Sequence, residues 1–194
     1  MGIEFDGTWK PHRTLQVEAL ASVGSWKYNS AGTVFLYDAN YILQDTIEYS
    51  AKGIHLGDAA QTQLGGSVRW EPIKGLYFKA RYTYFTNYYA SFDPIVLVPI
   101  YNASGVQVGD NRDRDSWKIP SYGLVDAFCG YEYRDLKVGA DQRQIRVAFT
   151  LSIVNVLNTS YISDAQNGAY FNSSSSLVYM GMGRRWVVGA KFSF

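Results

Sequence analysis

The side chains best suited to ion binding stand close together in one polar segment, which contains Asp110, Asp113 and Asp115. Carboxylates at such short spacing could bind calcium, because Ca²⁺ takes oxygen ligands from a flexible loop. The EF-hand pattern is absent, and Arg112 and Arg114 alternate with the acidic residues and could neutralise them. We therefore interpret the segment as a solvated loop whose charges pair with one another, in preference to a metal site.

Residues that commonly act as nucleophiles, bases or soft metal ligands are scarce. His12 and His55 are the two histidines, the first in an expected turn and the second near an expected loop, so they support neither a catalytic triad nor a metal cluster. The single cysteine, Cys129, excludes an internal disulfide framework, and we interpret it as a small apolar residue on a strand. The sequence therefore predicts no enzyme activity, no metal and no cofactor.

Composition narrows the class of protein. The 18 basic and 17 acidic residues leave a net charge of +1, which argues against an electrostatic nucleic-acid binder. Aromatic residues make up 16% of the 194 residues and charged residues 18%, below the roughly 25% that soluble domains carry. Tyrosine suits a membrane interface, where its ring is in an apolar place and its hydroxyl is wet. Composition alone equally allows a tyrosine-rich soluble β-protein.

Membrane-spanning helices and a signal peptide are not predicted. The longest apolar run, residues 95–98, ends at Pro99 and falls far short of the roughly 20 residues that a transmembrane helix needs. Spanning would therefore be done by strands. Residues 1–6 have neither the basic nor the apolar region of a signal peptide, so we expect the chain to be either cytosolic or part of something longer.

The last residues of the chain alternate with a period of two, as a strand with one apolar face does. The apolar side carries Trp186, Val188, Ala190, Phe192 and Phe194. The polar side carries Arg185, Val187, Gly189, Lys191 and Ser193. Nine residues at about 3.3 Å each, tilted by about 45°, rise roughly 20 Å, close to the height of an outer-membrane lipid band. Aromatic residues at both ends match the interfacial girdles of membrane barrels.

The same alternation recurs along the chain and predicts further strands. The expected strands are residues 2–10, 14–23, 62–70, 76–88, 121–133 and 143–154. Two extended stretches within residues 33–49 are open to two readings, because they could be spanning strands or a hairpin within a large surface loop.

Connections between these strands fall into two length classes that roughly alternate. Short turns are expected at residues 10–13, 71–75 and 134–141, and long segments at residues 91–120 and 155–182. Outer-membrane barrels have this asymmetry, with short periplasmic turns and long extracellular loops. The total is seven or nine spanning strands, whereas single-chain bacterial barrels normally have an even number. We therefore predict an antiparallel transmembrane β-barrel in which residues 1–194 form the C-terminal part of a larger barrel, with a periplasmic carboxyl end.

Charged side chains fall mainly on the polar faces of these strands, which would line the lumen of a barrel. They are Glu4, Asp6, Glu18, Arg69, Lys79, Arg81, Asp126, Glu132, Arg146, Arg185 and Lys191. They could form a mixed-charge network against whatever fills the lumen, or a path for a charged substrate. We favour the network.

Several motifs in a fixed order carry a family resemblance over nearly the whole chain. They are residues 54–62, the Glu71-Pro72 turn, and residues 75–77, 87–90, 92–94, 120–126, 155–162 and 183–186. Together they resemble the C-terminal barrel region of TonB-dependent outer-membrane receptors, of the kind abundant in Bacteroidetes. The resemblance implies a barrel of about 22 strands with an N-terminal plug, which imports scarce nutrients with energy relayed by the TonB complex. It also favours the surface hairpin for residues 33–49.

The resemblance implies partners and substrates outside this chain. Plug, TonB-binding segment and signal peptide are absent from it, so they are expected in a separate piece. Partners would be the rest of the receptor, the TonB complex, membrane lipid and lipopolysaccharide, and a surface lipoprotein is a further candidate. Siderophore, haem, cobalamin, peptide and glycan receptors share this barrel.

Two sets of residues are our candidate functional positions. Loops carry variable recognition on a rigid scaffold, so substrate or partner contact is predicted for the two long segments. The loop candidates are Asp110, Arg112, Asp113, Arg114, Asp115, Asn167 and Tyr170. The resemblance makes Trp186, Phe192 and Phe194 a terminal signal for barrel assembly. A complete small outer-membrane barrel with an adhesin or structural role is the alternative, and a soluble β-sandwich binding module is the third.

Overall fold

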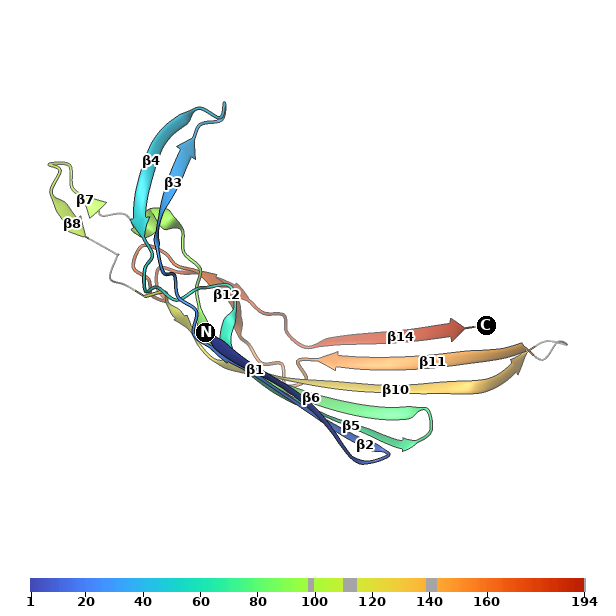
Figure 1. Ribbon diagram of the computed structural model, residues 1–194. Coiled ribbons are helices and arrows are strands. Elements are labelled where there is room, and N and C mark those ends of the chain that lie inside the picture. The colour runs from blue at the N-terminus through green and yellow to red at the C-terminus, as the bar shows by residue number, and fades with distance from the viewer. Residues whose placement is uncertain (98–99, 110–114, 139–142, 194) are drawn as a thin grey trace.

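The computed structural model describes residues 1–97, 100–109, 115–138 and 143–193 of the chain. This part is all-β, with antiparallel sheets and one short 3-10 helix, η1 (Pro94–Leu97). Seven long strands form the main sheet in the order β1-β2-β5-β6-β10-β11-β14, so each pairs with the long strand next to it along the chain (Figure 1). Their bounds are β1 (Gly2–His12), β2 (Leu15–Gly24), β5 (Ala60–Ile73), β6 (Leu76–Tyr89), β10 (Tyr122–Val138), β11 (Arg143–Val154) and β14 (Arg185–Ser193).

All seven strands predicted from alternation are confirmed, and β11 has the predicted bounds. The cross-strand register places the predicted apolar residues of neighbouring strands opposite one another, as in Leu151 with Cys129 and Val188 with Leu151. The sheet therefore has one apolar and one polar face along its length. The predicted closing strand is β14, and Phe194 lies outside the described residues.

Two predicted turns are shorter than expected, because proline lies inside the strand before each turn. Pro11 belongs to β1, which among the described residues pairs with β2 alone, so the missing N–H can lie on the side without a partner strand. Pro72 belongs to β5. The register shifts beside each proline, between Trp9 and His12 in β1 and before Ile73 in β5, as a β-bulge does.

The prediction of a polar connection from residue 134 onward is wrong for its first part. β10 continues to Val138, and Leu136 pairs with Ile145 after a register shift that follows Tyr133. Backbone pairing with β11 continues through this polar stretch, because ladder hydrogen bonds do not depend on side-chain polarity. Residues 139–142 lie outside the described part.

The ambiguous residues 33–49 form a surface hairpin, not spanning strands. β3 (Ala31–Tyr37) and β4 (Leu43–Ser50) pair with each other in a separate two-stranded sheet. The Asp38 carboxylate organises the turn, since its Oδ1 accepts hydrogen bonds from the backbone N–H groups of Asn40 at 2.8 Å and Ile42 at 2.9 Å. Figure 1 shows this hairpin projecting away from the main sheet.

Smaller strands lie in the other two long segments. β7 (Ile100–Tyr101) pairs with β8 (Gln107–Gly109), and β12 (Ile162–Gln166) pairs with β13 (Leu177–Met180). β9 (Lys118–Ile119) pairs with the end of β6. The long segments are therefore folded, with their own ladders.

Short turns and long connections lie at opposite ends of the main sheet, as predicted (Figure 1). At the short-turn end, residues 13–14 join β1 to β2 and residues 74–75 join β5 to β6. Gly75 has φ +89°, a left-handed conformation that favours glycine, and it accepts a hydrogen bond from the Glu132 N–H at 2.8 Å. We call the described residues of 25–59, 90–121 and 155–184, at the other end, the loop cap.

Buried apolar side chains gather in the loop cap and at the strand ends beside it. One cluster is Ala60, Tyr88, Ala90, Ile119 and Ala165, and the other is Ala51, Ile54, Leu97 and Phe171. Among the described elements, the long strands contact their neighbours in the sheet, and no second layer covers either face along their length. The molecule is thus a folded cap on one end of a single, uncovered sheet.

Candidate functional site: the apolar sheet face and the loop cap

One face of the sheet is uncharged across all seven strands. Cross-strand pairing links one residue from each strand into a continuous row. The row is Trp9, Val17, Val68, Ala80, Ala127, Ile153 and Trp186. Following the same register from Ile3 in β1 to Phe192 in β14, none of the described residues that share this side is charged as far as Ile145 in β11, after which Arg143 continues the alternation at the short-turn end. We call it the apolar face.

The apolar face is widely exposed. Trp9 keeps 67% of its surface, Phe149 54% and Val188 78%. Exposed apolar surface costs about 25 cal/mol per Å² in water, and soluble domains avoid that cost by packing a second layer on such a face. In the described part of the chain no such layer covers the apolar face.

The row across the apolar face runs obliquely to the strand ends. Trp9 lies close to the short turn at Arg13, whereas Ile153 lies near the far end of β11, at the loop cap. Such stagger means that the strands tilt, which is the geometry that closes a sheet into a barrel. Large aromatic residues lie at both ends of the face, with Trp70 and Tyr131 toward the short turns and Tyr84 toward the loop cap.

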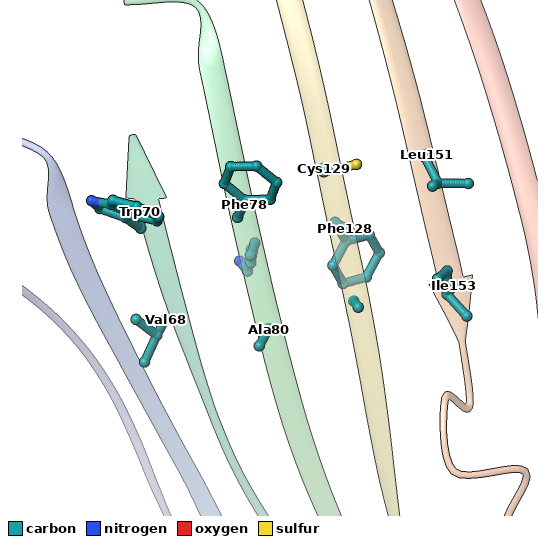
Figure 2. A pocket seen from close by; sticks show the side chains of 10 residues that line it. Val68, Trp70, Phe78, Ala80, Phe128, Cys129, Leu151 and Ile153 are labelled. Atoms are coloured by element: carbon teal, nitrogen blue, oxygen red, sulfur yellow. The ribbon is translucent and has the colours of Figure 1, made fainter. Parts of the chain in front are cut away.

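A hollow of about 390 Å³ lies in the middle of the apolar face (Figure 2). Small side chains of β6 and β10 form its floor, and larger ones, Trp70 and Phe78 on one side and Leu151 and Ile153 on the other, stand beside it. Its apolar-face lining is Val68 and Trp70 from β5, Phe78 and Ala80 from β6, Ala127 and Cys129 from β10, and Leu151 and Ile153 from β11. Lys79 and Phe128 also border the hollow, but they occupy positions of the opposite face in β6 and β10. None of the apolar-face side chains is charged, so the hollow suits a hydrocarbon group.

The opposite face holds a network of charged and polar side chains. Lys79 Nζ lies 2.7 Å from Glu18 Oε2, and the Ser67 hydroxyl donates to the same oxygen at 2.5 Å. Gln16 Nε2 donates to the other oxygen, Glu18 Oε1, at 2.8 Å. Four neighbouring polar groups on three strands thus bind one another, as the sequence prediction of a mixed-charge network requires.

A second pair on the polar face joins the sheet to the loop cap. The Arg81 guanidinium donates to Asp126 Oδ2 from Nη2 at 2.6 Å and from Nε at 3.1 Å. The other carboxylate oxygen accepts from the backbone N–H of Asn155 at 2.9 Å. Only 7% of the Asp126 side chain is exposed. Both oxygens of this buried carboxylate are therefore satisfied, one by the neighbouring strand and one by the cap.

Three buried amides fix the backbone of the loop cap. Gln61 accepts from the Trp26 N–H at 3.0 Å and donates to the Trp26 carbonyl at 2.8 Å. Asn155 accepts from the Thr159 N–H at 2.8 Å and donates to its carbonyl at 2.9 Å. Asn167 likewise uses its side-chain amide to bind backbone groups, the Trp117 N–H and the Ala90 carbonyl. Gln61 and Asn155 fall in motifs that carried the family resemblance, and their burial gives those motifs a structural reason.

The predicted loop residues divide into four groups. Asn167 is buried, accepting from the Trp117 N–H at 3.1 Å and donating to the Ala90 carbonyl at 3.4 Å, so it joins two long connections. Tyr170 keeps 64% of its surface exposed. Asp115 contacts His55. Asp110, Arg112, Asp113 and Arg114 lie outside the described residues. Substrate contact by these residues stays a prediction.

Sequence reasoning missed the contact between His55 and Asp115. His55 Nδ1 lies 2.6 Å from Asp115 Oδ2, and the His55 backbone N–H donates to Oδ1 at 2.9 Å. The imidazole stacks on the Tyr89 ring, with centroids 4.0 Å apart and the planes at 1°. These residues join two long connections to the end of β6. A separation of 60 positions leaves no local signal for the pair.

Tyr28 lies in the loop cap with 38% of its surface exposed. Tyr28 packs edge-on against Phe92, with ring centroids 5.3 Å apart. Burial raises the pKa of the Tyr28 hydroxyl above its usual range, and the Asp58 carboxylate adds to that rise. Tyr28 therefore stays neutral at physiological pH.

The described residues of the proposed assembly signal lie on the apolar face. Trp186 keeps 62% of its surface and Phe192 59%, while Phe194 is outside the described part. Within the described residues, no three His, Cys, Asp or Glu side chains come together as a metal site. No helix in the described part is long and apolar enough to cross a membrane.

Comparison with known proteins gives no relative. No protein family and no curated protein matches this chain. The fold therefore defines the class as an antiparallel all-β protein built on one amphipathic sheet, with a folded cap at one end.

Proposed function

We propose that this chain forms part of the wall of a TonB-dependent outer-membrane receptor, an importer of scarce nutrients. The observation that carries this proposal is the uncharged, uncovered face that runs across all seven strands. In a bilayer this face contacts lipid, and the backbone polar groups of the spanning strands are satisfied by their ladders. The aromatic residues at its two ends then lie at the two membrane interfaces.

Barrel geometry is supported by three features together. Neighbouring strands pair in chain order, and the row across the sheet is staggered. Short turns lie at one end of the sheet and long connections at the other. Under this proposal the short turns are periplasmic and the loop cap is extracellular. β14 then runs toward the periplasm.

The two edges of the sheet support a larger barrel. In the described part of the chain, β1 pairs with β2 alone and β14 with β11 alone. An open edge exposes unpaired backbone groups, which is costly in lipid. Further strands of the receptor therefore pair with both edges and close the barrel. The polar face then lines the lumen and contacts the plug, which is coupled to the TonB complex.

Substrate recognition falls to the loop cap and the plug together. The cap is held by buried amides, so it can present exposed side chains such as Tyr170 on a fixed backbone. Siderophore, haem, cobalamin, peptide and glycan are the candidate classes.

A complete small barrel with an adhesin or structural role is the second candidate. Seven long strands are close in number to the about eight that make a barrel whose lumen side chains fill, although single-chain barrels normally have an even number. Refolding the chain alone in detergent, followed by unheated gel electrophoresis, separates the two. We expect an open or aggregated chain that becomes compact when the remaining strands are supplied. A compact, heat-modifiable monomer would support the small barrel, and soluble folding without detergent would overturn both.

A further inference from the structure

We infer that the hollow on the apolar face binds an acyl chain of an anionic phospholipid, whose headgroup lies beside Lys74 in the β5–β6 turn. This inference rests on the proposed function, because it requires that the apolar face contacts lipid. It adds a defined lipid site to a surface that would otherwise meet bulk lipid.

The first support is the shape of the hollow. Alanine and cysteine side chains on the central strands, Ala80, Ala127 and Cys129, leave a depression between the bulkier Phe78 and Leu151 (Figure 2). A fixed depression in a lipid-facing wall must be filled, since atoms lining an empty space lose their dispersion contacts. A flexible hydrocarbon chain can fill it.

The second support is the chemistry of the lining. Among the described residues that form the hollow on this face, every side chain is apolar or, as in Cys129, only weakly polar. Such a surface has no group to orient a peptide or a sugar. An acyl chain needs none, because its burial is driven by area and packing alone.

The third support is the charge at the short-turn end. Lys74 is exposed in the β5–β6 turn, and Lys10 and Arg13 are exposed near the neighbouring β1–β2 turn. Two acidic residues lie beside them: Glu71, which is paired with Arg69 at 2.6 Å, and Glu132, which lies across the turn from Lys74. Among the described side chains Lys10, Arg13, Arg69 and Lys74 outnumber these two acids, and the net positive charge favours an anionic lipid.

Distances along the strand fit one lipid molecule. Lys74 precedes Phe78 by four residues, so the headgroup and the near edge of the hollow are separated by roughly 13 Å of extended chain at most. Strand tilt shortens this height, and half of a hydrocarbon core is about 15 Å. A chain descending from the level of Lys74 thus reaches the hollow before the bilayer centre.

The test is native mass spectrometry of the assembled receptor, extracted from its own membrane and supplied with phosphatidylglycerol or phosphatidylethanolamine. Ala127→Phe fills the hollow, and Ala190→Phe is the matched control, because Ala190 lies on the same face of β14, outside the hollow. Lys74→Gln removes the positive charge of the protein beside the proposed headgroup position. Lys52→Gln, in the loop cap, is its control.

We expect wild type and both controls to retain phosphatidylglycerol in preference to phosphatidylethanolamine. Ala127→Phe should lose both lipids, and Lys74→Gln should weaken phosphatidylglycerol alone by about fivefold, the equivalent of about 1 kcal/mol per basic residue at a lipid surface. Equal retention by Ala127→Phe and Ala190→Phe would overturn the site. Loss of membrane insertion by wild type would contradict the proposed function instead, so the two failures are distinguishable.

Discussion

Arg81 and Asp126 form an ion pair across neighbouring strands, with Nη2 and Oδ2 2.6 Å apart, and the same carboxylate accepts a hydrogen bond from the Asn155 backbone at 2.9 Å. A single buried acid thus connects β6, β10 and the loop cap. It adds a polar connection to the apolar cluster of Ala60, Tyr88, Ala90, Ile119 and Ala165, which also joins the strand ends to the cap.

Asp126→Asn should therefore destabilise the protein. The neutral amide weakens the bond to Arg81, and hydrogen bonds to charged groups contribute about 1.5–3 kcal/mol. We expect a loss of about 1–2 kcal/mol, seen as a lower temperature of the heat-modifiability transition on gels. Asp6→Asn, at an exposed position of the polar side of β1, is the control. Equal transitions for the two variants would show that the pair does not hold cap and sheet together.

Substitutions of Asn155 should lower the stability of the protein in a definite order. It has φ +55° and its side chain bonds to the Thr159 N–H, the Thr159 carbonyl and the Met182 carbonyl. Asn155→Gly loses the bonds but keeps the backbone relaxed, whereas Asn155→Ala loses the bonds and adds about 1 kcal/mol of left-handed strain. We expect stability in the order Asn, Gly, Ala. An alanine variant as stable as the glycine variant would contradict this account.

His55 should hold two connections of the loop cap together. Replacing it by leucine removes its side-chain hydrogen bond to Asp115 and the stacking on Tyr89. We expect faster amide hydrogen exchange in peptides that cover residues 54–58 and 115–119, without a change in the long strands. His12→Leu, at the short-turn end, should leave these peptides unchanged. Unaltered exchange in His55→Leu would mean that other contacts suffice.

Val187 and Val188 offer a matched test of the two faces. They are neighbours in β14, both exposed, and they pair with Ser152 and Leu151 on opposite sides of the sheet. If both faces were in water, an arginine at either position would change the free energy of folding little. In a barrel wall Val188→Arg should impair membrane assembly, because arginine on the lipid face costs about 2–4 kcal/mol near the bilayer middle, whereas Val187→Arg faces the lumen. Similar assembly of both variants would argue against a lipid-facing side.

The strands and their faces could be predicted from sequence because both depend on a local period of two. Residues 143–154 alternate without interruption, and the structure gives β11 the same bounds. The bounds of the turns were harder to predict, because a proline such as Pro11 or Pro72 normally marks the end of a strand. The register shifts that let these prolines stay inside β1 and β5 depend on the pairing with the next strand. No local pattern reports such a shift.

Contacts of the candidate site could be predicted only in part. The sequence placed Glu18, Lys79 and Arg81 on polar faces, but which cation meets which acid depends on the register between strands. Asn167 was predicted as a contact for substrate or partner, which stays a prediction, and its burial between two connections could not be read from the sequence. His55 and Asp115 come from different loops that only the folded cap brings together.

The most direct test of the central claim compares Cys129 with its neighbour Phe128. Cys129 pairs with Phe78 and Leu151 on the apolar face, and Phe128 pairs with Lys79 and Ser152 on the other. A fluorophore is attached to Cys129, or to Phe128→Cys in a Cys129→Ser background, and the receptor is placed in bilayers with nitroxide-labelled lipid. We predict strong quenching at position 129 and little at position 128. Equal or reversed quenching would contradict a lipid-facing apolar face.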